Sequence, residues 1–407
     1  MTRPLDLKSG DLKPGDLASA AVPPARDLVR ARLATLVAFF ASGAVYAGWV
    51  PQIPLVKLRL GLGDQALGAA LFGLAAGGIA ALPLAAALIQ RYGSRSVMLA
   101  GGFAFCILLP LLPLAPSWAV LTLLLFLFGA GHGLMDVAMN AQAVVLEARR
   151  GRPLMSSFHG FFSLGNFAAA GGCGLLLAAG LSAELTALAI ALAMFVALVA
   201  CRGWLLQGKA ERAAHETAHV AASWRPTGLL LALAALAFAA LLAEEAMTDW
   251  STVFLRFTRD LSAAAAAGGY AGYAAAMAVG RLLGDRLVQG LGPARLVLVG
   301  ALIAAAGLVA AIIFPWPGAA IIGFAAVGFG TANNMPLLFG AAGLAQGGRA
   351  GHGIAIVAAA AYGAFLVGPL IIGFTAQHLS LPAALGIIVV ALLCVAGGSV
   401  VLRRTGG

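Results

Sequence analysis

Twelve long apolar segments constrain this chain more than any other feature of its sequence. A helix needs about 20 apolar residues to cross the roughly 30 Å hydrocarbon core of a bilayer. Segments of about that length or longer recur from end to end, at residues 31–57, 66–89, 97–114, 118–146, 156–180, 184–206, 227–255, 263–289, 294–314, 317–344, 353–376 and 381–402. We therefore predict an all-α polytopic membrane protein with twelve transmembrane helices.

The composition excludes the other broad classes of protein. The chain of 407 residues is 62% hydrophobic and 10% charged, whereas soluble domains are about 45–50% apolar and about 25% charged. So high an apolar content also excludes a disordered chain. The abundance of Ala, Leu and Gly favours helices over a transmembrane barrel, whose strands would alternate in segments of about ten residues.

The positions of Lys and Arg predict the orientation of the chain. With both termini in the cytoplasm, all of the 25 Lys and Arg residues face the cytoplasm except Lys57, Arg59, Arg256 and Arg259. Such a bias is typical of bacterial inner-membrane proteins. It also accounts for the net charge of +10, because the basic loops face anionic lipid. We therefore expect membrane lipid as a partner, and no nucleic acid.

A polar interruption at 207–226 follows the sixth apolar segment and divides the chain into two halves. We predict a disordered cytoplasmic tail at 1–26, a six-helix bundle at 27–206, a cytoplasmic linker at 207–226 and a second six-helix bundle at 227–407. The halves show weak internal similarity, as between Gly129-Ala130-Gly131 and Gly328-Phe329-Gly330. Parallel halves predict a substrate site at their interface near the midplane, with access alternating between the two sides.

The segment Gly280-Arg281-Leu282-Leu283-Gly284-Asp285-Arg286 resembles the loop signature of the major facilitator superfamily. A narrower resemblance covers most of the membrane region, and the residues that carry it are 136–140, 155–165, 243–244 with 249–250, and 362–369. It is to the YbjJ-type permeases, a branch that includes a rhizopine-transport protein and is distantly similar to the fucose–proton symporters. The resemblance implies a secondary active transporter that is a functional monomer and needs no cofactor.

Two departures from superfamily patterns bear on function. The first half has Gln90 where the loop signature has Asp. The fifth segment lacks the Gly-Pro-rich motif that drug–proton antiporters of the superfamily usually carry, and Gly368-Pro369 lies in the eleventh segment instead. The second departure argues against a drug exporter.

Four acidic residues lie well inside the apolar segments: Asp136, Glu244, Glu245 and Asp249. A charge at the bilayer centre costs at least about 2.5–3.5 kcal/mol, so an acid there indicates function. A poorly hydrated cavity favours the neutral form of a carboxyl group, as a proton carrier requires. We predict that Asp136 and Glu244 couple transport to protons and that Glu245 binds substrate. Asp249 lies nearer the outer end, where an outer-gate ion pair and a site role are both open.

Amide and aromatic side chains form the rest of the predicted binding site. Asn140 shares a helical face with His132 and Asp136, and Asn333 precedes Pro336, which would leave the backbone locally irregular. The binding candidates are Tyr46, Trp49, Asn140, Asn166, Tyr270, Tyr273, Asn333 and Tyr362. Each has a structural alternative: helix packing, an interfacial belt for Trp49, or, for Asn333, a hydrogen bond to the carbonyl that Pro336 frees. Such side chains suit a polyhydroxylated or amino-sugar solute.

Charged residues near the predicted cytoplasmic ends of the segments are candidates for gating. Glu147 lies beside Arg149, which predicts an inner-gate ion pair, and His159 lies at the cytoplasmic end of the fifth segment. The loops between the second and third and between the eighth and ninth segments supply Arg91, Asp285 and Arg286, and Arg281 lies at the inner end of the eighth segment.

The prediction is therefore a secondary transporter that takes up a small polar solute by proton symport. The alternative is a proton-driven exporter of small organic or drug-like molecules. The sequence has no HExxH, GxSxG or GxxxxGK[ST] motif, so neither an enzyme nor an ATP-driven pump is indicated. Its four cysteines lie in apolar runs without metal-ligand spacing, and no metal site is expected.

Overall fold

A computed structural model describes residues 25–151, 154–207, 227–345 and 350–404. The predicted tail at 1–26 and linker at 207–226 lie almost wholly outside the described residues. The first half consists of α1 (Ala25–Trp49), η1 (Val50–Gln52), α2 (Ile53–Leu60), α3 (Asp64–Tyr92), α4 (Ser94–Leu108), η2 (Leu109–Leu114), α5 (Trp118–Arg150), α6 (Met155–Ala178), α7 (Ala183–Cys201) and η3 (Arg202–Trp204). The second half consists of α9 (Gly228–Phe257), α10 (Ala263–Leu291), α11 (Pro293–Ile313), α12 (Pro317–Thr331), α13 (Asn334–Leu344), α14 (Ala350–His378), α15 (Leu381–Gly398) and η6 (Ser399–Arg404).

The described helices confirm the prediction of twelve spans. Eleven helical segments of the described residues are long and apolar enough to cross a membrane. The span that completes the twelve is α10, the eighth along the chain. It has 29 residues and carries Arg281, Asp285 and Arg286 toward its C-terminal end.

Two of the predicted spans are interrupted near a proline: the first, where no break was expected, and the tenth, where an irregular backbone was expected. The first span turns through η1, where Pro51 lacks the N–H of a regular helix, and continues as α2. The tenth breaks between α12 and α13, three residues before Pro336. The irregular backbone predicted at Asn333 is therefore confirmed.

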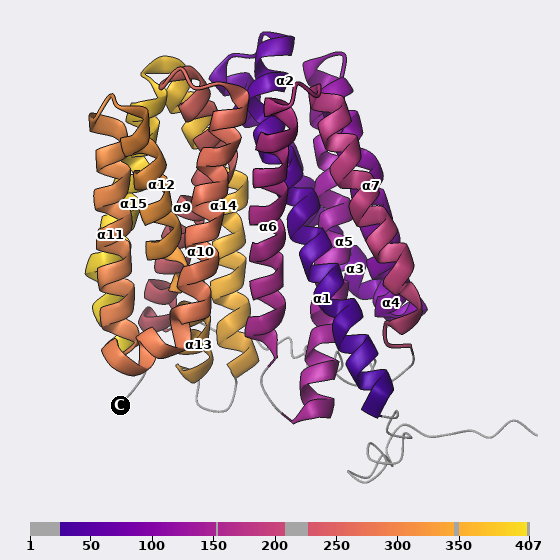
Figure 1. Cartoon of the computed structure of the whole chain (residues 1–407). Coiled ribbons are helices and arrows are strands. Elements are labelled where there is room, and N and C mark those ends of the chain that lie inside the picture. The colour runs from indigo at the N-terminus through magenta and orange to yellow at the C-terminus, as the bar shows by residue number, and fades with distance from the viewer. Residues whose placement is uncertain (1–24, 152–153, 208–226, 346–349, 405–407) are drawn as a thin grey trace, which may run out of the picture.

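The helices stand side by side in one bundle, with the first half and the second half next to each other (Figure 1). The two halves pack together mainly along α6 with α10 and along α3 with α14. Chain elements α1 and η6 place the described ends of the chain at one end of the bundle, called the termini end below, and α2 lies at the other, called the α2 end (Figure 1).

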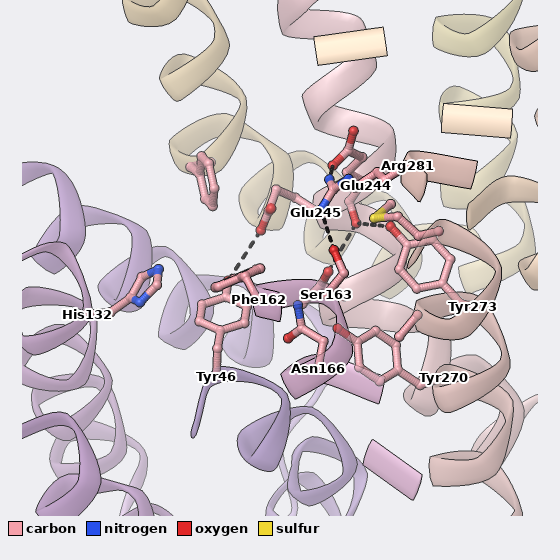
Figure 2. A pocket seen from close by; sticks show the side chains of 14 residues that line it. Tyr46, His132, Phe162, Ser163, Asn166, Glu244, Glu245, Tyr270, Tyr273 and Arg281 are labelled. Atoms are coloured by element: carbon pink, nitrogen blue, oxygen red, sulfur yellow. Dashed lines mark hydrogen bonds and ion pairs between the residues drawn. The ribbon is translucent and has the colours of Figure 1, made fainter. Parts of the chain in front are cut away.

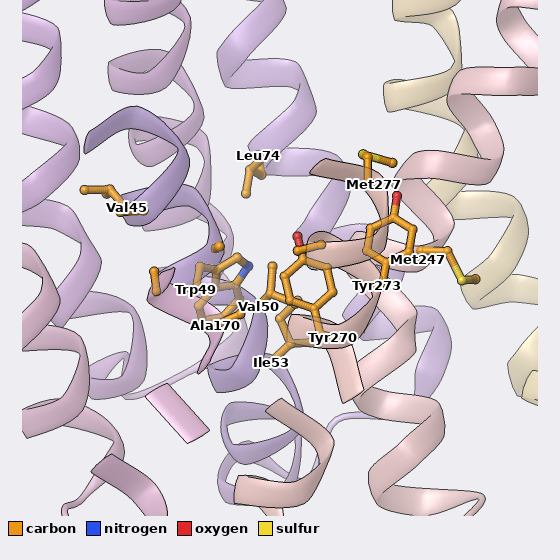
Figure 3. Packing of buried hydrophobic residues seen from close by; sticks show 14 of the residues in the cluster. Val45, Trp49, Val50, Ile53, Leu74, Ala170, Met247, Tyr270, Tyr273 and Met277 are labelled. Carbon is orange, nitrogen blue, oxygen red and sulfur yellow. The ribbon is translucent and has the colours of Figure 1, made fainter. Parts of the chain in front are cut away.

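The hydrophobic core joins the halves at the α2 end and separates them toward the termini end. The larger cluster of buried side chains includes Trp49, Ile53 and Phe254 and contains residues of both halves. A smaller cluster, which includes Leu233 and Leu338, belongs to the second half alone and lies at the termini end. Figure 3 shows the larger cluster where side chains of α1, α9 and α10 meet.

Polar contacts close the α2 end. The hydroxyl of Thr252 on α9 donates to the carbonyl oxygen of Val50 at 3.0 Å, and both residues are fully buried. Lys57 pairs with Asp64 at 3.1 Å and also lies 5.3 Å from the ring centre of Phe257 in the other half. The described structure is thus sealed at the α2 end.

Glycines allow the closest helix contacts, both within one half and between the halves. On α5, a Cβ at Gly129 would run into the carbonyl oxygen of Leu74 on α3. On α3, a Cβ at Gly68 would run into the carbonyl oxygen of Pro369 and lie 3.1 Å from the Cα of Gly373 on α14. Small residues let helices in membranes approach this closely. The first contact stabilises one half, and the second closes the α2 end.

The substitution Gly129→Ala should destabilise the first half, because its methyl group overlaps the backbone of α3. Overpacking of this kind costs about 1–3 kcal/mol. Thermal unfolding of the purified protein in detergent measures the loss. Gly172→Ala on α6 is the control, since nothing lies within 4 Å of that Cβ. Equal unfolding temperatures for the two variants would contradict the assignment.

The substitution Gly68→Ala should oppose closure of the α2 end without disturbing either half. If the methyl group raises the free energy of the closed state by about 1–3 kcal/mol, the ratio of open to closed molecules should rise about fivefold or more. The measurement is labelling of Thr248→Cys by a membrane-impermeant maleimide added on the α2 side, in a Cys394→Ser background. Gly171→Ala is the control, because its Cβ would make an ordinary contact of 4.0 Å with Ala271 across the same interface. Unchanged labelling rates in Gly68→Ala would refute the role of this crossing.

Candidate functional site

Two adjoining cavities lie between the halves, near the middle of the helices that line them. The first has a volume of about 160 Å³ and the second about 250 Å³. The two cavities adjoin, because five residues line both: Tyr46, His132, Phe162, Arg281 and Phe365. Figure 2 shows the first cavity, with side chains of the two halves on opposite sides.

A partly buried ion pair in the first cavity is linked to the other half through its arginine. Arg281 Nη2 on α10 lies 3.4 Å from Glu244 Oε2 on α9, within the second half. Arg281 Nη1 donates to the hydroxyl of Ser163 on α6 of the first half at 2.9 Å. Ser163 in turn donates to the carbonyl oxygen of His159 at 3.1 Å. One guanidinium therefore connects a carboxylate of one half to a helix of the other (Figure 2).

A second polar contact between the halves involves the neighbouring acid. The Tyr46 hydroxyl on α1 donates to Glu245 Oε2 at 3.4 Å (Figure 2). The ring of Tyr46 lies 5.1 Å from that of His132, whose Nδ1 is 3.4 Å from the Ser42 hydroxyl. Glu244 and Glu245 are adjacent in sequence. Glu245 contacts the first half directly, whereas Glu244 is linked to it only through Arg281.

Asp136 belongs to the second cavity. Asn140 Nδ2 donates to Asp136 Oδ1 at 3.2 Å and to the Asp136 carbonyl oxygen at 2.9 Å. The two residues lie one turn apart on α5, as the sequence predicts. Asn140 itself is not among the described residues that line either cavity. Its role in this structure is to orient Asp136.

Two hydrogen-bond acceptors of the first cavity have no partner among the described atoms. They are Glu244 Oε1 and Asn166 Oδ1, and both atoms are buried. Glu244 is only 8% exposed. Buried polar atoms are ordinarily paired, because an unpaired one costs about 1–3 kcal/mol. A ligand that brings hydrogen-bond donors would satisfy them.

Aromatic rings complete the walls. Tyr270 and Tyr273 on α10 stack with ring centres 5.7 Å apart in the first cavity, and the Tyr273 hydroxyl lies 3.5 Å from the Glu244 carbonyl oxygen. Tyr362 and Phe365 on α14 lie 6.1 Å apart and line the second cavity. Thr248 also lines the first cavity, and its hydroxyl donates to the Glu244 carbonyl oxygen at 3.2 Å.

The structure brings together most of the predicted binding residues, but not all. Trp49 and Asn333, like Asn140, are absent from the described lining of the cavities. Trp49 is 2% exposed and packs in the hydrophobic core (Figure 3). It therefore lies neither in the cavity lining nor in an interfacial belt. Asn333 donates to the carbonyl oxygen of Gly280 at 3.0 Å. The carbonyl that Pro336 frees, on Ala332, lies 3.5 Å from Arg281 Nε instead.

The predicted gating residues have several different environments. Arg281 lines both cavities and His159 lines the second, where it is exposed. Glu147 accepts from the backbone N–H groups of Leu154 at 2.7 Å and Met155 at 3.0 Å, at the start of α6. Those donors have no partner inside the helix, so Glu147 caps α6 and, among the described residues, forms no ion pair with Arg149.

The predicted outer-gate ion pair of Asp249 is likewise not formed within the described residues. Asp249 is buried on α9. Arg256 donates to the carbonyl oxygen of Leu261 at 3.3 Å, and Arg259 donates to that of Ile312 at 3.0 Å. Both guanidinium groups therefore bond to the backbone at helix ends.

The remaining gating candidates lie on the surface of the termini end. Asp285, Arg286 and Arg91 are exposed there. The guanidinium of Arg91 lies 5.2 Å from the ring centre of its neighbour Tyr92. None of the three lies among the described residues that line the cavities.

The sequence-based site residues omitted Ser163 and Thr248, which the structure places in the first cavity. Ser163 had a usable signal, because it shares a helical face with His159 and Asn166. Thr248 had a weaker one, since it lies one turn after Glu244. Hydroxyl groups inside a span are common packing residues, and only their neighbours in space reveal the role.

Comparisons with known proteins identify the family and the fold. The sequence profile of the Major Facilitator Superfamily matches residues 33–344. An uncharacterized MFS-type transporter of Yersinia pestis is 40% identical over 92% of this chain and 96% of its own length. The membrane protein MosC of Rhizobium meliloti is 29% identical over 90% of this chain and 88% of its own length.

Solved structures show the same fold. The nucleoside transporter NupG superposes with a TM-score of 0.68 at 13% identity, over 92% of this chain and 99% of that one. A bacterial homolog of the human lysosomal transporter Spinster gives a TM-score of 0.71 at 15% identity, over 94% of this chain and 98% of that one. The chain therefore belongs to the Major Facilitator Superfamily and is a multi-pass membrane protein, a secondary transporter and not an enzyme.

Proposed function

We propose that the protein takes up a small polar solute, sugar-like or amino-sugar in type, by proton symport across a bacterial inner membrane. The observation that carries this proposal is the buried Glu244 carboxylate, which pairs with Arg281 while Arg281 also bonds to Ser163 of the other half. A protonatable group thus lies in the cavity and takes part in a contact between the halves.

Protonation of Glu244 would change that contact directly. The ionised carboxylate balances the guanidinium in a buried setting, where an unpaired charge is strongly unfavourable. A proton on Glu244 removes the balancing charge and leaves the guanidinium that bonds to Ser163 without its ionic partner. Proton binding would in this way alter the balance between inward-facing and outward-facing states, as coupling requires.

Asp136 is the second proton-binding group in the proposal. It lines the second cavity, and its carboxylate oxygen Oδ1 accepts from Asn140, a neutral residue of its own helix. Without a cationic partner in this contact, the neutral form is the less costly one in a poorly hydrated cavity.

Solute recognition is assigned to the lining residues that offer hydrogen bonds and ring faces. Glu244 Oε1 and Asn166 Oδ1 supply buried acceptors without partners. The other proposed binding residues are Tyr46, Glu245, Tyr270, Tyr273 and Tyr362. A solute with several hydroxyl or amino groups brings donors for the acceptors and C–H faces for the rings.

The proposed orientation places the termini end in the cytoplasm, in keeping with the bias of Lys and Arg. The separate core clusters at that end support an inward-open conformation. Opening and closing would then involve Lys57 and Asp64 at the α2 end and Arg281 between the halves.

A second candidate function is proton-driven export, and the charges around the cavities favour it. Three acids, Asp136, Glu244 and Glu245, line the described cavities with one guanidinium, that of Arg281. An excess of carboxyl groups attracts organic cations, which would compete with protons for the same sites.

The test is a screen of the purified protein for thermal stabilisation by sugars, polyols, amino sugars and lipophilic cations, followed by transport of the hits into proteoliposomes. A bound solute stabilises the protein by about 2.7 kcal/mol at a hundredfold excess over Kd. Glu244→Gln should abolish solute-driven proton movement while solute exchange at equilibrium persists. Glu184→Gln, an acid at the start of α7 away from the cavities, is the matched control and should behave as wild type.

Proton movement in the same direction as a polyhydroxylated solute supports symport. Movement in the opposite direction, or hits confined to lipophilic cations, places export first. Full solute-driven proton movement in Glu244→Gln would overturn the assignment of Glu244.

A further inference from the structure

The second cavity differs in chemistry from the first. Its wall on the first half is formed by small and apolar residues of α3 and α5: Leu74, Ala75, Gly78, Ile79, Leu82, Gly129 and Gly133. The rings of Tyr362 and Phe365 on α14 also line this cavity. Asp136 and His159 lie in the same lining, and Arg281 joins this cavity to the first. The result is an apolar chamber that continues into a polar one.

Helix packing explains two of the glycines in that wall. A Cβ at Gly129 would run into the carbonyl oxygen of Leu74, and a Cβ at Gly133 would lie 2.7 Å from the carbonyl oxygen of Gly78. Larger residues at either position would push α3 and α5 apart. These glycines are therefore required by the fold of the first half.

Packing does not explain Gly78. A Cβ there would meet a single atom within 4 Å, the carbonyl oxygen of Gly129 at 3.5 Å, which is an ordinary contact. Gly78 nevertheless lines the second cavity. A glycine inside a helix is less favourable than alanine, and an unfilled apolar wall forgoes contacts with other atoms. What Gly78 provides is room in the chamber.

We propose that this chamber binds an apolar, ring-sized part of the transported solute, and that Gly78 determines specificity by leaving room for it. The proposal rests on the transport function proposed above and narrows its substrate class. The solute is a small amphipathic molecule. Its donor-bearing part contacts Glu244 and Asn166 in the first cavity, and its ring lies between the glycine-containing wall and the rings of α14.

The shared walls of the two adjoining cavities support a single solute that occupies both. Tyr46, Phe162 and Phe365 belong to both linings. The unpartnered acceptors, Glu244 Oε1 and Asn166 Oδ1, belong to the polar side alone. A wholly polar solute would leave the apolar wall without contacts, and a wholly apolar one would leave both acceptors unpaired.

The experiment uses two matched pairs of probes with the full-length protein in detergent. One pair is methyl glucoside and phenyl glucoside, and the other is ethanolamine and phenylethanolamine. Dissociation constants come from thermal stabilisation across a range of probe concentrations. In at least one pair, the phenyl compound should bind the wild type about tenfold more tightly than its partner.

The substitution Gly78→Leu fills the chamber and should reduce that preference to about twofold or less. Gly386→Leu on α15 is the matched control, because nothing lies within 4 Å of its Cβ, and it should keep the preference. Should Gly78→Leu fail to fold, Gly78→Ala and Leu82→Ala test the same point. Gly78→Ala should weaken the preference for the phenyl compound. Leu82→Ala enlarges the chamber and should allow a naphthyl glucoside to bind with the same preference.

Three results would overturn the proposal: no preference for phenyl in either pair, a preference that Gly78→Leu leaves intact, or no binding of any probe. Its failure is distinguishable from failure of proton coupling. Equal binding within the pairs, together with solute-driven proton movement in proteoliposomes, removes the apolar subsite and leaves symport in place. A preference for phenyl without proton movement does the reverse.

Discussion

The contact on which the site depends is the partly buried ion pair of Glu244 and Arg281, extended to Ser163 of the other half. Removing one partner is unfavourable, because the other charge is then left uncompensated at a partly buried site. The pair therefore fixes the relative positions of α9 and α10. Through one further hydrogen bond it also ties α10 to α6. A protonation event on a single oxygen is in this way linked to the arrangement of two six-helix bundles.

Glycines make this arrangement possible by letting helices approach closely at chosen points. Gly129 holds α3 against α5 within one half, whereas Gly68 and Gly373 let α3 meet α14 across the halves. The first kind of contact keeps each half rigid. The second kind closes the α2 end and must separate when that end opens. Rigid halves that meet at a few small residues are well suited to rocking about a central cavity.

The sequence predicts the spans, the division into halves and several cavity residues, because hydropathy and helical spacing carry that information. Acids inside the spans, such as Glu244 and Asp136, stand out by their cost in a bilayer. The sequence does not reveal which helix covers a given face. That is why the sequence does not show that Trp49 is a core residue, that Glu147 caps a neighbouring helix, or that Arg281 pairs with Glu244. A proline lies at or near each of the two helix breaks, at Pro51 and at Asn333. Only the break at Asn333 was predicted from the sequence.

The central claim is that the charge on Glu244 controls how the halves are joined. Its most direct test is the distance between spin labels on Ala148 of α5 and Gln289 of α10, both exposed at the termini end, in a Cys394→Ser background. Double electron–electron resonance measures that distance as the pH is lowered. Acid should shift the wild type toward shorter distances, as the termini end closes. Glu244→Gln should show the shorter distances at every pH. The same pH-dependent shift in wild type and Glu244→Gln would contradict the account.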